Sequence, residues 1–223
     1  MEVITGDETG LIKVIDVSKR EFLTYGSQDR NSSVEALSWL TNGYGQKDFA
    51  ILRANSNLEA WRYEPGQISM LTSISLPSMV SPLSVSLIEA NRVVCVGKAG
   101  DVSIVRLNDC NSASESARKK EDKSLNWDIL GSFQVKGPVG ACATCNGGAA
   151  FGGSENDVVL YDTMTQQSTW SARNVPYDSL RLKVPICKFY FVPFQNSSAD
   201  IRCFEYDFNA VLKTVLSRLF VTS

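Results

Sequence analysis

The sequence contains no histidine among its 223 residues. Imidazole is the usual base beside a serine or cysteine nucleophile, a common zinc ligand and the side chain that titrates near neutral pH. Its absence excludes Ser–His and Cys–His hydrolases and histidine-ligated metal sites within this chain. The paired carboxylates Asp7–Glu8 and Glu155–Asp157 fall in predicted turns that water reaches, a poor setting for acid–base catalysis. We therefore expect a non-enzymatic protein without a cofactor.

The sequence also lacks a long apolar run and an excess of one charge. A membrane-spanning helix needs about 20 apolar residues, and the N-terminal MEVITGDETG has neither the basic nor the apolar part of a secretory signal. The 22 basic and 24 acidic side chains give a net charge of −2. Non-specific binding of nucleic acid by a whole surface needs many uncompensated positive charges. We expect a globular protein that does not bind membranes, with local basic patches left open.

Six cysteines are present, but only Cys142 and Cys145 form a C-x-x-C pair. A structural zinc site needs four ligands, and neither a second pair nor a histidine completes this one. Residues three apart in a strand point to opposite faces, which would separate the two thiols. We interpret the cysteines as reduced, mostly buried side chains of a cytosolic or nuclear protein, with no metal site.

A repeated pair of short strands around a tight polar turn is the main pattern in the sequence. Glycine, asparagine and aspartate in these turns tolerate the positive φ angles that hairpins need. The four copies span Val3–Val17, Asp48–Glu64, Arg92–Leu107 and Gly148–Thr163.

The hairpins recur with a nearly constant period. Ile15, Trp61, Val105 and Tyr161 occupy equivalent positions, separated by 46 (15 to 61), 44 (61 to 105) and 56 (105 to 161) residues. The first two intervals match the roughly 40–45 residues of a four-stranded propeller blade. The polar segment 108–124, NDCNSASESARKKEDKS, accounts for the longer third interval as a charged loop inserted in the third blade.

Further apolar segments flank the hairpins and supply the remaining strands of each blade. First strands are predicted at Val34–Leu40, Leu83–Ile88 and Val139–Cys145, and fourth strands at Ile68–Leu76, Asn126–Val135 and Gln167–Arg173. No helical period persists before the tail, where Val211, Leu212, Val215, Leu216, Leu219 and Phe220 predict a short helix. The sequence therefore predicts an all-β protein, a β-propeller of about four to five blades.

These repeats resemble the WD-repeat superfamily with a degraded signature. Ile15-Asp16 and Tyr161-Asp162 keep the aspartate of the Trp-Asp dipeptide, whereas Trp61-Arg62 keeps the aromatic residue and loses the aspartate. The Gly-His dipeptide is absent. The four tryptophans are predicted to pack between blades rather than to stack on RNA bases.

A narrower resemblance concerns the stretch from Gly152 to Ile186. It is similar to the family of WD repeat-containing protein 74 and its yeast counterpart among the Nsa proteins, in which a G-G-x-E-N turn and an aromatic-Asp strand end precede an A-[RK]-N-V-x-x-D-x-L-x-L-x-V-P-[IV] segment. The matching residues here are Gly152, Gly153, Glu155, Asn156, Tyr161, Asp162, Ala172, Arg173, Asn174, Val175, Asp178, Leu180, Leu182, Val184, Pro185 and Ile186.

The resemblance implies a nucleolar factor that assembles the large ribosomal subunit precursor. Its expected partners are other assembly factors, pre-ribosomal RNA, an AAA-type ATPase and the exosome-linked RNA helicase. Family members form a closed seven-bladed ring, so we expect residues 1–195 to form a partial propeller, residues 196–223 to be a divergent tail, and the chain to be C-terminally truncated. A generic WD40 adaptor, for example for a ubiquitin ligase, stays open as the alternative function.

The candidate contact residues lie in the narrow motif. Alternation in SLRLKVPI places Arg181 and Lys183 on one strand face, where they would bind RNA phosphate or an acidic partner. Arg173, Asn174 and Asp178 complete this polar set. A solvated strand face with a structural turn at Asn174–Asp178 explains the same residues equally simply.

Overall fold

The computed structural model describes residues 2–40, 48–89, 91–109, 125–145, 147–153 and 156–172. This part of the chain consists of fifteen strands and one short 3-10 helix, η1 (Arg30–Ser32), with no α-helix. The all-β prediction is confirmed.

Four antiparallel sheets follow one another along the chain, and we call them blades one to four. Blade one contains β1 (Glu2–Gly6), β2 (Ile12–Asp16) and β3 (Glu21–Tyr25). Blade two contains β4 (Val34–Trp39), β5 (Asp48–Arg53), β6 (Asn57–Glu64) and β7 (Gln67–Ser75). Blade three contains β8 (Pro82–Glu89), β9 (Arg92–Gly97), β10 (Asp101–Asp109) and β11 (Leu125–Gln134). Blade four contains β12 (Ala141–Cys145), β13 (Gly148–Gly153), β14 (Asn156–Asp162) and β15 (Gln167–Ser171).

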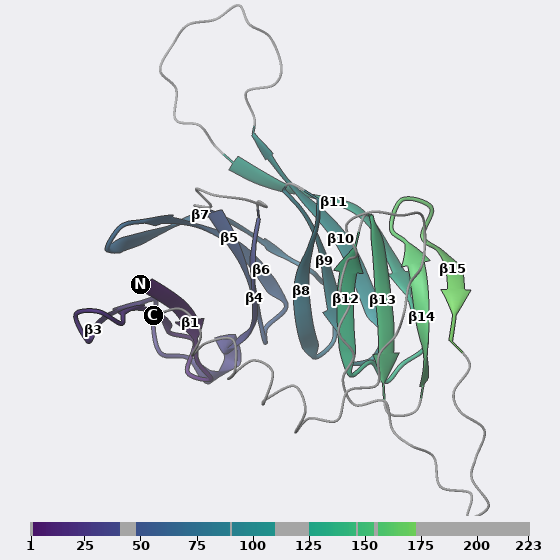
Figure 1. The fold of residues 1–223 in the computed structure, drawn as a ribbon, viewed down its shortest axis with the longest axis horizontal. Helices are drawn as coiled ribbons and strands as arrows, with labels where there is room; N and C mark the ends of the chain where they lie inside the picture. The colour runs from purple at the N-terminus through teal and green to yellow at the C-terminus, as the bar shows by residue number, and fades with distance from the viewer. Residues whose placement is uncertain are drawn as a thin grey trace, which may run out of the picture.

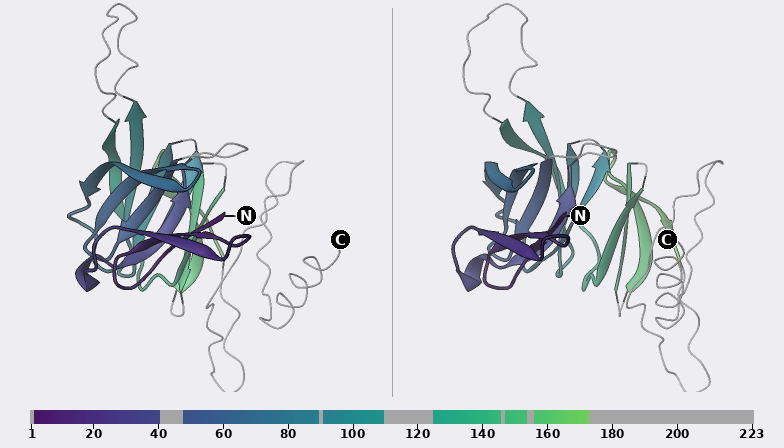
Figure 2. Two further views of the ribbon diagram at one scale, coloured as in Figure 1. Left: turned by 90° about the vertical axis from the view of Figure 1, so that its left-hand side faces the viewer. Right: turned by 60° about the vertical axis from the view of Figure 1, so that its left-hand side comes forward.

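The blades are arranged as a fan (Figure 1). The first strands β4 and β12 both contact β8, so these three strands line the inner side of the arc. Each sheet runs in chain order from this side outward, and the two views in Figure 2 show the sheets fanning out from one another. The described blades form an arc, an incomplete ring, as the sequence predicted.

Apolar side chains fill the junctions between blades. Ile12 and Val14 of blade one pack with Phe49 and Trp61 of blade two. Blades two and three share a cluster that includes Leu58 and Trp127. Ile104 of blade three packs with Phe151 of blade four, beside the stacked rings of Phe133 and Tyr161. Because a blade is apolar on both faces, its stability depends on its neighbours.

Two kinds of turn repeat with the blades. Gly10, Ser56 and Gly100 end the turns before β2, β6 and β10, each with a positive φ. Arg20 and Gln166 end the turns before β3 and β15 with a φ of 57°. These recurring left-handed residues show that the hairpin repeat of the sequence is a repeat of backbone geometry.

The structure corrects the predicted strands in two places. β3 was not predicted, because its sequence EFLTY is short and lacks the alternation of apolar and polar residues that marks a half-buried strand; four of its five residues are exposed. Asn108 and Asp109, assigned to the charged loop 108–124, extend β10 and pair with Asn126 and Leu125 of β11. The rest of that loop and the tail 196–223 with its expected helix lie outside the described residues.

Candidate functional site

The linkers between the described blades all lie at the same end of the strands. In an antiparallel blade the turn between the second and third strands lies at the same end as the linker that leaves the fourth strand. The turns 54–56 and 98–100 therefore meet the linkers 76–81 and 135–140. In the three-stranded blade one, two strands separate the turn 7–10 from the linker 26–33, so these two segments lie at that same end. We call these six segments the turn rim.

Backbone hydrogen bonds join the turn rim between blades one and two. The amide of Asp29 donates to the carbonyl of Thr9 at 2.8 Å, and that of Val34 donates to the carbonyl of Asp7 at 3.1 Å. The Ala54 amide donates to the carbonyl of Ser33 at 2.9 Å. These bonds fix the linker against both turns that flank it.

The same arrangement recurs further along the rim. The Lys98 amide donates to the carbonyl of Ser81, and the Val139 amide donates to the carbonyl of Lys98, both at 2.9 Å. Asp101 accepts from the Val80 amide at 2.8 Å. The turn 98–100 thus holds the linker on each side of blade three, which makes the rim a continuous, preformed surface.

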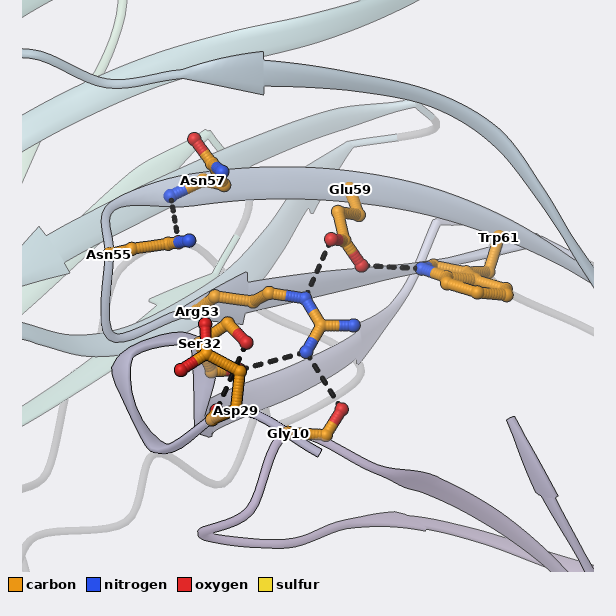
Figure 3. Close-up of polar contacts among 8 residues, drawn as sticks. All are labelled: Gly10, Asp29, Ser32, Arg53, Asn55, Asn57, Glu59 and Trp61. Atoms are coloured by element: carbon orange, nitrogen blue, oxygen red, sulfur yellow. Dashed lines mark hydrogen bonds and ion pairs between the residues drawn. The ribbon is translucent and has the colours of Figure 1, made fainter. Parts of the chain in front are cut away.

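A buried arginine supports the rim at the first junction (Figure 3). The Nη1 group of Arg53 donates to the carbonyl of Gly10 at 2.9 Å and to that of Ser32 at 2.8 Å, while Nε contacts Glu59 at 2.6 Å. The other oxygen of Glu59 accepts from the indole N–H of Trp61 at 2.8 Å. Arg53 is only 6% exposed. One side chain of blade two therefore binds the turn of blade one and the linker between them.

Arg92, the second buried arginine, also joins two blades, but it lies at the other end of the strands, away from the turn rim. It is 8% exposed and contacts Glu89 at 3.1 Å and the hydroxyl of Thr163 at 3.2 Å. Thr163 belongs to the turn before β15, so Arg92 connects blade three to blade four. Buried charges are costly unless they are paired. Each arginine contacts a glutamate of its own blade, Glu59 or Glu89, and donates hydrogen bonds to the neighbouring blade.

Among the exposed side chains of the turn 98–100 and of the two linkers that hydrogen-bond to it are one large apolar group and two lysines, which we call the patch. Val80 is 62% exposed in one linker, and Lys98 and Lys136 are exposed in the adjoining turn and the next linker. An apolar side chain and two ammonium groups on neighbouring segments suit an acidic partner surface. This patch was not predicted, since nothing in the sequence indicates that these linkers and this turn meet.

The aspartates kept from the Trp-Asp dipeptide have a structural role. Asp16 accepts from the amides of Ser18 and Lys19, and Asp162 accepts from those of Met164 and Thr165. These bonds hold the pKa of both carboxyls below the ordinary value. Both aspartates close turns and keep their charge, which does not suit them to donate a proton in catalysis.

All five predicted contact residues, Arg173, Asn174, Asp178, Arg181 and Lys183, lie outside the described residues. The prediction for the tryptophans is met in part. Trp61 and Trp127 pack between blades at 8% and 2% exposure, whereas Trp39 and Trp170 keep 39% and 41% of their surface exposed.

The cysteines that the structure describes are apolar in their surroundings. Cys95 is buried in the cluster between blades two and three, and Cys142 packs against the cluster between blades three and four. Burial raises the pKa of the Cys142 thiol to about 12 and that of Cys95 further. The thiolate is the form of cysteine that reacts and binds metals. Because both pKa values are raised, these two thiols stay protonated and unreactive near neutral pH.

Within the described ranges, no three histidine, cysteine, aspartate or glutamate side chains are placed to hold a metal ion. The same part of the chain contains no helix long and apolar enough to cross a membrane.

Comparison with known proteins identifies the fold. No family model and no curated protein matches the chain. Among solved structures, a chain of the Mitotic Checkpoint Complex is 12% identical with a TM-score of 0.53, covering 77% of this chain and 45% of that one. The WD40 beta propeller domain of Doa1 is 13% identical with a TM-score of 0.54, covering 77% of this chain and 50% of that domain's chain.

The fold first defines a class: the protein is an all-β repeat protein whose described part consists of radial antiparallel blades, one of three strands and three of four. More narrowly, its fold is that of the WD40 β-propellers. It spans about half the length of the solved chains that it matches, at 45% and 50%.

Proposed function

We propose that the protein is a non-catalytic, protein-binding scaffold that acts in assembly of the large ribosomal subunit precursor. The turn rim is the observation that carries the binding role. A surface held by backbone hydrogen bonds and by Arg53 loses little conformational entropy on binding, so contacts made there convert efficiently into affinity. The ribosomal role is supported by the resemblance of the Gly152–Ile186 stretch.

The exposed patch of Val80, Lys98 and Lys136 gives the proposal a defined contact surface. Its charge suits the acidic side chains of other assembly factors, and backbone hydrogen bonds hold the two segments that carry the lysines. The same resemblance makes pre-ribosomal RNA, an AAA-type ATPase and the exosome-linked RNA helicase the expected companions in the nucleolus.

Co-sedimentation with large-subunit precursors on a sucrose gradient tests this function. The wild-type chain should travel with the precursor peak, and the double variant Lys98→Glu/Lys136→Glu should lose at least about 90% of that fraction, since each reversed contact costs about 1 kcal/mol or more. Lys19→Glu, in a turn at the opposite end of the fan, is the matched control and should co-sediment as wild type does.

The outcomes separate the two halves of the proposal. A wild-type chain that stays at the top of the gradient would refute the ribosomal role and favour the generic WD40 adaptor. Co-sedimentation of the double variant would show that the contact with the precursor does not depend on these two rim lysines. Arg181→Glu/Lys183→Glu then tests the predicted motif in the same assay.

A further inference from the structure

In the described part of the chain, blade one has no strand at the innermost position. β1 comes directly before the turn that ends at Gly10, as β5 and β9 come directly before the turns that end at Ser56 and Gly100. β1 is therefore the equivalent of the second strand of the other blades. Whereas β5, β9 and β13 pair with the first strands β4, β8 and β12, β1 lies at the edge of its sheet. We call the side of β1 that faces away from β2 its inner edge.

The exposure of one β1 side chain shows that water reaches the inner edge. Ile4 lies on the face that packs toward blade two, and strand pairing aligns it with Val14. Val94 holds the same position in blade three, where it is aligned with Ile104 and packs toward blade four. Val94 is 0% exposed, whereas Ile4 is only half-buried. Because a following blade covers both residues, the difference arises at the inner edge, where β8 shelters Val94 and no described strand shelters Ile4.

Blade two presents apolar side chains beside this inner edge. β1 contacts β4 as β5 contacts β8, and the first strands β4 and β8 also contact each other. A strand paired with the inner edge of β1 would therefore lie beside β4. Leu37 of β4 packs against the cluster between blades one and two, and Trp39, two residues further on, lies on the same face. Trp39 meets Phe49 edge-on at 5.7 Å between ring centroids and is 39% exposed, so apolar surface is available there.

Acidic side chains lie at one end of the same edge. Strand pairing aligns Glu2 with Asp16 and Asp16 with Glu21, and Lys19 contacts Asp16 at 3.4 Å. The first strands of the other blades run antiparallel to the second strands. A strand in the equivalent position of blade one would therefore end beside Glu2, where a basic side chain near its C-terminal end suits the carboxylate.

We propose that the inner edge of β1 binds an extended peptide strand of another protein, which completes blade one as its innermost strand. Unpaired N–H and C=O groups along a sheet edge direct the pairing of an added strand, and contacts with alternate side chains select its sequence. The matching peptide has five to eight residues, the lengths of β12 and β8. Apolar residues at alternate positions pack on Leu37 and Trp39, and a basic residue at the C-terminal end faces Glu2. This inference does not depend on the ribosomal role.

Fluorescence anisotropy of a labelled peptide tests this site on the full chain. The probe is LSVSLK, the alternating segment 83–87 of β8 followed by a lysine. It should bind the wild-type chain saturably. Trp39→Lys removes apolar surface beside the edge and should weaken binding at least about tenfold, since aromatic residues dominate the energy of interfaces. Trp170→Lys changes a tryptophan of blade four that is 41% exposed; it is the matched control and should bind the peptide as wild type does.

Two methylated peptides test strand pairing without any change in the protein. In an antiparallel pair, the amides of alternate residues face the partner strand. One peptide carries N-methyl groups on its two leucines and its valine, and the other carries them on its two serines. Only one of these sets can face β1, so one peptide should lose at least about tenfold in affinity while the other binds within about threefold of the parent.

Each other outcome overturns the proposal. If the parent peptide does not bind a wild-type chain that circular dichroism shows to be folded, the inner edge does not accept a strand. Equal affinities of the two methylated peptides show adsorption of apolar side chains without strand pairing. Unchanged affinity in Trp39→Lys places the peptide away from β4; if that variant fails to fold, the methylated peptides decide alone. A wild-type dimer that the peptide dissociates in sedimentation shows that a second copy occupies the edge.

Discussion

Single residues in the left-handed region carry measurable strain. Arg20 ends the turn between β2 and β3 with a φ of 57°, a backbone conformation that side chains with a Cβ disfavour. Arg20→Gly should therefore stabilise the protein by about 0.5–1 kcal/mol, the part of the strain that glycine's larger unfolded-state entropy does not cancel. Urea unfolding measures the change. Lys19→Gly, one residue earlier and outside the left-handed region, should destabilise instead; stabilisation by both substitutions would contradict the argument.

The Asp7 carboxylate makes the stability of blade one depend on pH. Lys13 contacts it at 2.8 Å, and Thr9 and the Leu11 amide also donate to it. These partners, Lys13 first, hold the pKa of Asp7 well below its ordinary value. A depressed pKa in the folded state stabilises the fold above the unfolded-state pKa of about 3.9, and this contribution is lost as pH falls toward the folded-state pKa.

Asp7→Asn should therefore lower the thermal midpoint near neutral pH, and the difference from wild type should shrink as the pH falls below about 4. Thermal unfolding followed by circular dichroism between neutral and acidic pH measures it. Glu8→Gln in the same turn controls for the general loss of a negative charge. A difference from wild type that stays constant through the acidic range would show that Asp7 acts through its shape alone.

At the scale of elements, Arg53 decides how firmly blade one is attached to blade two. Its removal would leave the carbonyls of Gly10 and Ser32 without this donor and Glu59 without its buried partner. Breaking a buried ion pair by removing one partner costs about 3–5 kcal/mol, so Arg53→Met should destabilise the protein by about 3 kcal/mol in urea unfolding. Arg30→Met, an exposed arginine on the same rim, should change stability by less than about 0.5 kcal/mol.

The strands show what the sequence could and could not predict. Hairpins such as Asp48–Glu64 were predictable, because alternating apolar residues and a turn are local signals. β3 was missed, because its adjacent apolar residues Phe22 and Leu23 break the alternation, and both are exposed in the structure. The strand register shifts between Ala60 and Trp61, between Ile104 and Val105, and between Leu160 and Tyr161. These bulges lie at equivalent positions, yet a bulge adds one residue without a distinct residue type, so periodicity alone does not reveal it.

The candidate site was less predictable than the fold for a related reason. In the sequence, Arg53 looks like any polar residue at the end of a strand. Its partners, the carbonyls of Gly10 and Ser32, lie 43 and 21 residues away and reach it only because blade one packs against blade two. The patch of Val80, Lys98 and Lys136 likewise depends on linkers meeting a turn. Contacts between elements decide both, and a single sequence contains no direct record of them.

At the scale of the whole molecule, the fan is a chain of nearest-neighbour interfaces. In the described part of the chain, each apolar cluster joins two neighbouring blades, so loss of one junction should loosen a terminal blade without unfolding the rest. Blade one meets blade two where Gly6 of β1 lies against Val34 of β4. A Cβ atom at Gly6 would overlap the Val34 side chain. Valine is stiff about χ1, so it adapts poorly to such an intrusion.

Gly6→Ala should therefore detach blade one selectively. We expect amide hydrogen exchange in β1–β3 to accelerate at least about tenfold while β9, β10 and β13 change by less than about twofold, because their apolar junctions lie further along the fan. The double variant Gly6→Ala/Val34→Ala should restore much of the protection, since removing the valine methyl groups frees the space that the new Cβ needs. Uniform acceleration across all four blades would show that the fan unfolds as one cooperative unit, and failure of the second substitution to rescue would place the defect in the backbone of β1.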